Sequence, residues 1–168
     1  EISVGILMDP LTAIMVVVVS GVGLLIQIYS VGYMRGDPGY SRFYAYMSLF
    51  TASMLGLVLA RNIIQLYVFW ELVGLSSYLL IGFWYHKPAA AAAAKKAFIV
   101  TRIGDFGFML AILYLFFNAD SFPVLSNALD VVVINEAATN ELIKGGVVTW
   151  IAAGIFAGAM GKSGQFSL

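Results

Sequence analysis

Residues 62–84 read NIIQLYVFWELVGLSSYLLIGFW, an apolar stretch with a single carboxylate, Glu71, near its middle. A hydrocarbon core about 30 Å thick is crossed by about 20 apolar residues in a helix. Backbone groups left unpaired in lipid are costly, so an irregular chain does not cross it. The stretch therefore predicts a transmembrane helix and an all-α membrane protein.

Four other stretches have a similar length and apolar character: 6–34, 40–60, 89–117 and 146–168. No alternation of apolar and polar residues marks the strands of a membrane barrel. Short turns at 35–39, at Arg61 and at 85–88 make consecutive helices antiparallel. The acidic segment 118–145 contains an apolar run too short to span, so we expect an extramembrane loop with one helix lying on the surface. The prediction is a polytopic bundle of about five transmembrane helices.

The composition supports this fold class and excludes several kinds of function. Hydrophobic residues make up 61% of the chain and charged residues 11%, far from the balance of a soluble domain. Nine basic and nine acidic residues cancel, so no positive field indicates a nucleic-acid partner. Cysteine is absent, which excludes thiolate metal sites and iron–sulfur ligation within this sequence. No glycine-rich phosphate loop or Ser/His/Asp arrangement is present, so we expect neither nucleotide binding nor covalent catalysis.

The two ends predict that this sequence is part of a longer protein. It begins without Met or a basic leader, and it stops directly after a glycine-rich motif.

The orientation in the membrane follows from basic residues near short loops, which favour the cytoplasmic side. One side holds Arg61 and Lys144. The other side, which we expect to face the cytoplasm, holds Arg35, Arg42, Lys87, Lys95 and Lys96.

Glu71 is the first candidate for function, because an ionisable residue inside an apolar span is costly and usually has a role and a partner. Apolar surroundings disfavour the carboxylate, whereas a nearby cation favours it. A partner whose charge changes would let Glu71 load and release a proton. The structural alternative is a permanently protonated acid, or one that hydrogen-bonds a neighbouring helix.

Lys162 is the second candidate and lies among glycines, following Gly154, Gly158 and Gly161. Such residues allow a membrane helix to unwind, and discontinuous helices at mid-depth form ion sites in transporters. We therefore predict a discontinuous helix near Lys162, with the lysine as a proton carrier. The alternative is a helix-packing face of small residues with a lysine that snorkels at the helix end.

Arg102 and Asp105 are three residues apart and share one face of a predicted helix, so they can pair or reach adjacent helices. Such a pair would modulate a buried charge, or would be a structural salt bridge near the membrane edge. Asp9 precedes Pro10 and Thr12, which predicts a capped helix start. His86 has no carboxylate or histidine at metal-ligand spacing, so we expect no metal site.

Five strings resemble a known family. They are MDPLT at 8–12, GYSRFYA at 39–45, FWELVGLSSYLLIG at 69–82, AFIVTRIGD at 97–105 and GKSGQFSL at 161–168. The family is the antiporter-like, proton-translocating subunit of respiratory complex I, of the chain 5 type, within the superfamily shared with Mrp-type antiporter subunits. The resemblance covers nearly the whole sequence except the acidic loop, and corresponds to a minority of a full subunit.

The resemblance implies a function and its residues. Glu71 and Lys162 would form one half of a proton pathway, with Arg102 and Asp105 as a modulating pair. The chain would be a membrane-arm subunit of an NADH:quinone oxidoreductase, a translocase whose redox chemistry lies elsewhere. NADH, FMN, iron–sulfur clusters and quinone would belong to partner subunits, and this chain would hold no cofactor or metal. The expected location is the bacterial inner membrane or the equivalent organelle membrane.

Two alternatives remain open. The first is a Mrp-type antiporter subunit that exchanges Na⁺ for H⁺; the RIGD string at 102–105 favours complex I, because the Mrp relatives lack its Arg and Asp. The second is a passive anchor in which the buried charges are static. Gly164 and Ser167 depart from the family's usual Ala and Pro, which could alter the predicted helix break. The electron donor, the quinone and the transported ion are not readable from these residues.

Overall fold

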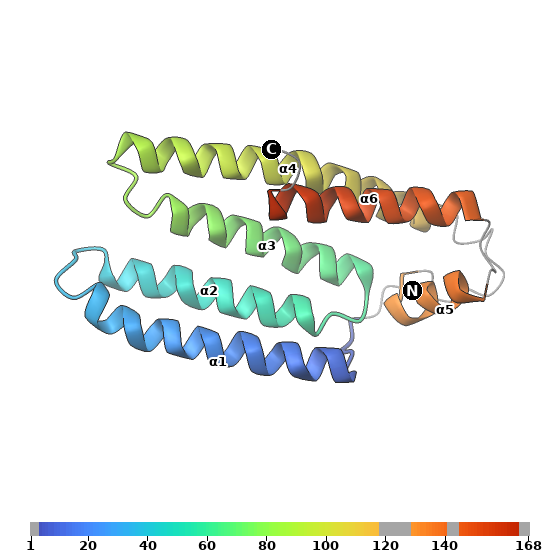
Figure 1. The fold of residues 1–168 in the computed structure, drawn as a ribbon, viewed down its shortest axis with the longest axis horizontal. Coiled ribbons are helices and arrows are strands. Elements are labelled where there is room, and N and C mark those ends of the chain that lie inside the picture. The colour runs from blue at the N-terminus through green and yellow to red at the C-terminus, as the bar shows by residue number, and fades with distance from the viewer. Residues whose placement is uncertain (1–3, 118–128, 141–144, 165–168) are drawn as a thin grey trace. The chain divides into compact units, whose positions relative to one another are not determined.

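The computed structural model describes residues 4–117, 129–140 and 145–164. Six helices follow one another in this part of the chain (Figure 1): α1 Pro10–Tyr33, α2 Tyr40–Val58, α3 Ile63–Ile81, α4 Pro88–Phe117, α5 Val131–Thr139 and α6 Gly145–Ser163. Over the same residues, β-pairing is limited to two isolated bridges. The predicted all-α class is confirmed.

The chain divides into two compact units. The first unit consists of Glu1–Ile6, Ala60–Tyr67 and Ile99–Leu168. The second consists of Leu7–Leu59 and Val68–Phe98. Helices α3 and α4 therefore each contribute one part to each unit.

Three helices of the described residues are long and apolar enough to cross a membrane: α1 with 24 residues, α3 with 19 and α4 with 30. On α1, most of the large apolar side chains are exposed, as expected for a surface that faces lipid or another protein. Helices α2 and α6 have 19 residues each, but hydroxyl-bearing or glycine residues dilute their apolar character. Their assignment as transmembrane helices stays a prediction.

The first helix begins later than the apolar pattern predicts, at Pro10 instead of residue 6. The Asp9 side chain accepts a 2.6 Å hydrogen bond from the Thr12 backbone N–H, and Pro10 takes the first helical position, where no N–H is needed. The predicted cap at Asp9 is confirmed. The N–H bond from Thr12 also lowers the pKa of Asp9. Hydrophobicity alone misplaced this boundary because the preceding apolar residues are extended.

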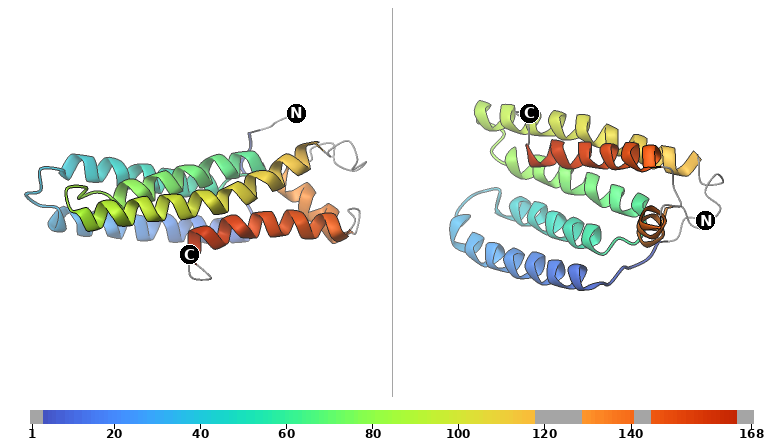
Figure 2. Two further views of the ribbon diagram at one scale, coloured as in Figure 1. Left: turned by 90° about the horizontal axis from the view of Figure 1, so that it is seen from above. Right: turned by 45° about the vertical axis from the view of Figure 1, so that its right-hand side comes forward.

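In the second unit, α1 and α2 form an antiparallel hairpin and lie side by side along their lengths (Figures 1 and 2). The turn between them uses Gly36, whose φ of 87° lies in the left-handed region that glycine tolerates. The Tyr44 hydroxyl donates a 2.8 Å hydrogen bond to the Gln27 carbonyl and joins the two helices. The hairpin follows the short turn predicted at 35–39.

In the first unit, the segment before α5 is attached to the start of α3. Backbone hydrogen bonds join Ile63 N–H to the Leu129 carbonyl at 2.8 Å and Val131 N–H to the Arg61 carbonyl at 3.0 Å. Asp130, with a relative exposure of 3%, accepts from Arg61 Nε at 2.7 Å and from the Val132 N–H at 3.0 Å. Asp130 is thus both the N-cap of α5 and the ion-pair partner that holds α5 in place.

We expect Asp130→Ala to loosen α5, because the substitution removes the cap and the ion pair together. A lost N-cap costs about 1–2 kcal/mol, equivalent to roughly five- to thirtyfold faster amide exchange in α5. Asp130→Asn is the matched control: it retains a capping oxygen and loses only the charge, worth about 1 kcal/mol or less since Arg61 is half exposed. Hydrogen exchange measured by mass spectrometry on the full-length protein tests this. Equal exchange in wild type and Asp130→Ala would contradict it.

The pH dependence of this attachment follows from the pKa of Asp130. Burial raises that pKa, but the hydrogen bonds from Arg61 and the Val132 N–H outweigh burial and hold it below 3.8. A carboxyl with a lowered native pKa stabilises the fold above its unfolded value, and this stability is lost as the pH falls through the native value. Protection of α5 should therefore be constant at neutral pH and decline only below about pH 4.

Candidate functional site

The candidate site depends on the close approach of two helices of the first unit, α6 and the C-terminal half of α4. Figures 1 and 2 show them side by side. A methyl group added at Gly104 would lie 2.7 Å from the Ala157 carbonyl oxygen, and one added at Gly154 would lie 2.7 Å from the Gly107 carbonyl oxygen. At Gly161 the nearest carbonyl, that of Val100, would be 3.2 Å away. Small residues thus let the two backbones touch, as in many membrane helix pairs.

This contact brings together three of the four predicted site residues. A carbon added at Gly104 would lie 3.1 Å from the Gly161 Cα, so Arg102 and Asp105, both on α4, lie close in space to Lys162 of α6. Asp105 is almost fully buried, with a relative exposure of 2%, whereas Arg102 and Lys162 are half-buried. Buried charges of opposite sign are retained where they compensate one another. These residues form a charged cluster rather than isolated surface groups.

Tyr67 of α3 is a fourth member that the sequence analysis missed. It also lies within the electrostatic influence of Asp105 and Arg102. Its ring packs edge-on against Phe108, with centroids 5.4 Å apart, and Phe108 itself is 1% exposed. A tyrosine hydroxyl can both donate and accept hydrogen bonds. Its spacing from Glu71 could have identified Tyr67 in the sequence, because residues four positions apart lie on the same face of a helix.

Glu71, the remaining predicted residue, is half-buried in α3 and belongs to the second unit. Arg102, Asp105 and Lys162 belong to the first unit. The electrostatic coupling of Glu71 to Lys162 stays a prediction, because the two residues belong to different units.

Lys162 lies in the last turn of α6, which continues without interruption through it to Ser163. Gly164 follows with a φ of 60°, a left-handed conformation that commonly ends helices. A cation in this position is stabilised by the negative end of the helix dipole. The predicted helix break would continue into residues 165–168, which lie outside the described part of the chain.

With Lys162 protonated, Arg102, Asp105 and Lys162 together carry one net positive charge; with neutral Lys162 they carry none. The net charge of the cluster would therefore change by one if Lys162 gained or lost a proton. Within residues 4–117, 129–140 and 145–164, no group of three histidine, cysteine or acidic residues is arranged to hold a metal ion.

Comparison with known proteins assigns this chain to a family. Residues 60–168 match the family model for the transmembrane region of NADH:quinone oxidoreductase and Mrp antiporter proteins, which covers more than half of the chain. The chain belongs to this family. Residues 1–44 match a second model, the N-terminus of chain 5 of NADH-ubiquinone oxidoreductase, complex I. The predicted resemblance is confirmed, and the chain is a membrane-embedded member of the NADH:quinone oxidoreductase/Mrp antiporter family.

Several relatives are similar to this chain over essentially the whole length of the chain. NAD(P)H-quinone oxidoreductase chain 5 of Synechocystis sp. is 47% identical over 170 residues, which cover 100% of this chain and 24% of the relative. The chloroplastic subunit 5 of Zygnema circumcarinatum is 48% identical over 169 residues, covering 99% and 23%. That of Anthoceros angustus is 50% identical over 167 residues, covering 98% and 22%. The chain thus spans about a quarter of the length of these relatives.

Proposed function

We propose that this chain is part of a membrane-arm subunit of an NAD(P)H:quinone oxidoreductase and that it moves protons. Electron transfer in partner subunits would change the charge or hydration around Glu71. The altered field would then change the proton affinity of Lys162, and protons would cross from the cytoplasmic side to the outer side. The subunit would act as a translocase and perform no redox chemistry itself.

The charged cluster of Arg102, Asp105 and Lys162, in which Asp105 is buried, is the observation that carries this proposal. A passive anchor would have little use for three ionisable side chains between closely packed helices, because buried charges are expensive. Two basic side chains with one carboxylate are a different arrangement, because the net charge changes by one when the lysine gains or loses a proton. The family to which the chain belongs is embedded in a membrane, where such a change in protonation can form a step of proton transport.

The proposal also assigns partners, cofactors and location. Other membrane-arm subunits and the lipid bilayer would surround this chain, and NADH or another donor, FMN, iron–sulfur clusters and quinone would be bound by partners. These cofactors supply electron chemistry, whereas this chain supplies polarised side chains. Because the relatives include cyanobacterial and chloroplast proteins, we place it in a bacterial inner membrane, a thylakoid membrane or an equivalent energy-converting membrane.

A second candidate function is Na⁺/H⁺ exchange without electron transfer, since the matched family model also includes Mrp antiporter proteins. The match of residues 1–44 to complex I chain 5 favours the redox-driven function. The two functions differ in what drives transport, and this difference can be measured directly.

The test is Lys162→Ala in the full-length protein within its assembled complex, in sealed vesicles. We expect NADH-driven proton pumping to fall about tenfold or more, equivalent to at least ~1.4 kcal/mol at the limiting step, because the proton carrier is lost. Quinone reduction measured in vesicles with an uncoupler should persist. Ser163→Ala, a change at the exposed neighbour, is the matched control and should retain pumping.

Two outcomes would contradict the proposal. Unchanged proton pumping per electron in assembled Lys162→Ala complexes would make Lys162 a packing residue. Proton movement driven by a Na⁺ gradient, and independent of NADH, would establish the antiporter function instead.

A further inference from the structure

Helix α3 carries Glu71, and an aromatic side chain two residues earlier, Phe69, packs this helix against α2. A carbon added at Gly56 of α2 would lie only 2.4, 2.5 and 2.6 Å from three atoms of the Phe69 ring, Cε1, Cδ1 and Cζ. The ring therefore occupies the space that a side chain at residue 56 would fill. A glycine at such a position lets two membrane helices approach closely. We call this packing the Phe69–Gly56 contact.

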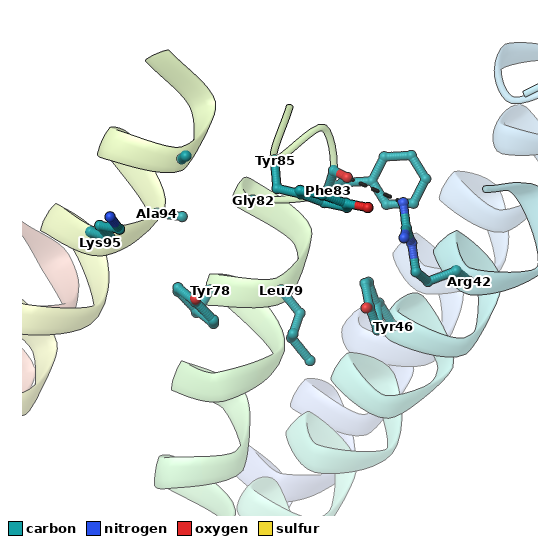
Figure 3. A pocket seen from close by; sticks show the side chains of 10 residues that line it. Arg42, Tyr46, Tyr78, Leu79, Gly82, Phe83, Tyr85, Ala94 and Lys95 are labelled. Carbon is teal, nitrogen blue, oxygen red and sulfur yellow. Dashed lines mark hydrogen bonds between the residues drawn. The ribbon is translucent and has the colours of Figure 1, made fainter. Parts of the chain in front are cut away.

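A second phenylalanine lies at the opposite end of the same helix pair. Phe83, in the turn after α3, is 5% exposed, and a carbon added at Gly39 would lie 2.7 Å from its Cζ. Figure 3 shows Phe83 beside Arg42 of α2, whose Nη2 donates a 3.4 Å hydrogen bond to the Phe83 carbonyl. A cavity of about 320 Å³ adjoins Phe83, with Tyr46 and Leu79 in its lining. Packing at this end is therefore incomplete, whereas the Phe69–Gly56 contact has no room for one further carbon.

The Phe69–Gly56 contact sets the direction in which Glu71 points. Successive residues of an α-helix are rotated by about 100°, so Glu71 lies about 200° around α3 from Phe69. Tyr78, two turns after Glu71, shares the face of Glu71, and its ring packs against Phe98 of α4 with centroids 5.2 Å apart. Figure 3 shows Tyr78 on the side of α3 that faces α4. Glu71 is therefore turned away from α2, on the face of α3 that contacts α4.

We propose that Phe69 is a positioning residue for Glu71. Gly56, Phe69 and Glu71 all belong to the second unit, so their arrangement is fixed within one compact unit. The Phe69 ring, set against Gly56, fixes the rotation of α3 and keeps the Glu71 side chain on the face that contacts α4. This inference rests on the proposed function, in which the surroundings of Glu71 change during electron transfer. Phe69 exchanges no proton and acts only through the position of Glu71.

The test is Gly56→Leu in the full-length protein within its assembled complex, in sealed vesicles supplied with NADH. The leucine side chain needs the space of the Phe69 ring, so α3 must tilt or rotate and carry Glu71 with it. We expect the number of protons pumped per electron to fall about tenfold or more, because displacing a reacting group by about 1 Å can cost about a hundredfold. Leucine favours a helix more than glycine does, so helix propensity cannot cause this loss.

The reciprocal substitution is the decisive measurement. Phe69→Ala added to Gly56→Leu makes room for the leucine and should restore most of the proton yield per electron. Ala52→Leu is the matched control: it adds a leucine one turn earlier on α2, at an exposed position, and should retain the wild-type yield. A general loss of stability would lower the amount of assembled complex, but not the yield of the complexes that remain. If Gly56→Leu does not assemble, Gly56→Ala replaces it, since its added carbon already meets the Phe69 ring.

Glu71→Gln, measured in parallel, separates a failure of this inference from a failure of the proposed function. Loss of pumping in Glu71→Gln with a wild-type yield in Gly56→Leu would overturn the role of Phe69 and leave the proposed function standing. Wild-type pumping in Glu71→Gln would overturn the part that the proposed function gives to Glu71, and the positioning role with it. A double variant that pumps no better than Gly56→Leu would also overturn the role of Phe69, because the loss would not arise from this contact.

Discussion

Replacing Asp105 by asparagine is expected to lower proton pumping by the assembled complex about tenfold, equivalent to ~1.4 kcal/mol. Asparagine has nearly the same shape, so packing against α6 is preserved while the negative charge is lost. Without that charge, the repulsion between Arg102 and Lys162 is no longer offset, so the charge balance on which the proposed proton relay depends is lost. Pumping in sealed vesicles, with uncoupled quinone reduction as the reference, measures the effect.

A double-mutant cycle separates this role from a general structural effect. If Asp105 acts through Lys162, then Asp105→Asn combined with Lys162→Ala should pump no worse than Lys162→Ala alone. Tyr67→Phe, which removes a hydroxyl within the influence of the same charges, is expected to have a smaller effect than Asp105→Asn. Independent, additive losses from Asp105→Asn and Lys162→Ala would contradict the coupling of Asp105 to Lys162.

Replacing Gly104 by alanine is expected to destabilise the contact between α4 and α6 by about 1–3 kcal/mol. The added carbon would lie 2.7 Å from the Ala157 carbonyl oxygen and 3.1 Å from the Gly161 Cα, and both are backbone atoms that cannot rotate away. The helices must therefore separate, which also moves Lys162 away from Asp105. Thermal unfolding of the full-length protein and proton pumping should both decrease.

Gly146→Ala is the matched control for this prediction. An added carbon at Gly146 has no atom within 4 Å, and alanine favours a helix over glycine by up to about 1 kcal/mol. This variant should be as stable as wild type or slightly more stable. A Gly104→Ala protein with wild-type stability would show that α4 and α6 do not depend on this close contact.

Much of the fold was predictable because it depends on local composition. The helices α2, α3 and α4 begin within one residue of the predicted positions, at Tyr40, Ile63 and Pro88. The errors lie at termini such as the start of α1, where the Asp9 cap and Pro10 outweigh the preceding hydrophobic residues. Hydrophobic length predicts which residues can cross lipid, but capping decides where a helix begins.

The candidate site was predictable in part, because ionisable residues in apolar helices are rare and conspicuous. Arg102, Asp105 and Lys162 were predicted in this way, and the structure brings them close together, while their role stays a prediction. Tyr67 escaped notice because an uncharged tyrosine is ordinary in a membrane helix, and only its neighbours distinguish it.

The sequence by itself determined that the chain is helical, lies in a membrane and carries a few buried charges, because each of these follows from the cost of transferring residues from water into lipid. Only the tertiary structure decided which of the polar residues meet. That depends on how closely two helices approach, and here the approach is set by Gly104, Gly154 and Gly161. Residues more than fifty positions apart in the chain become one cluster because these glycines leave no side chain between the backbones.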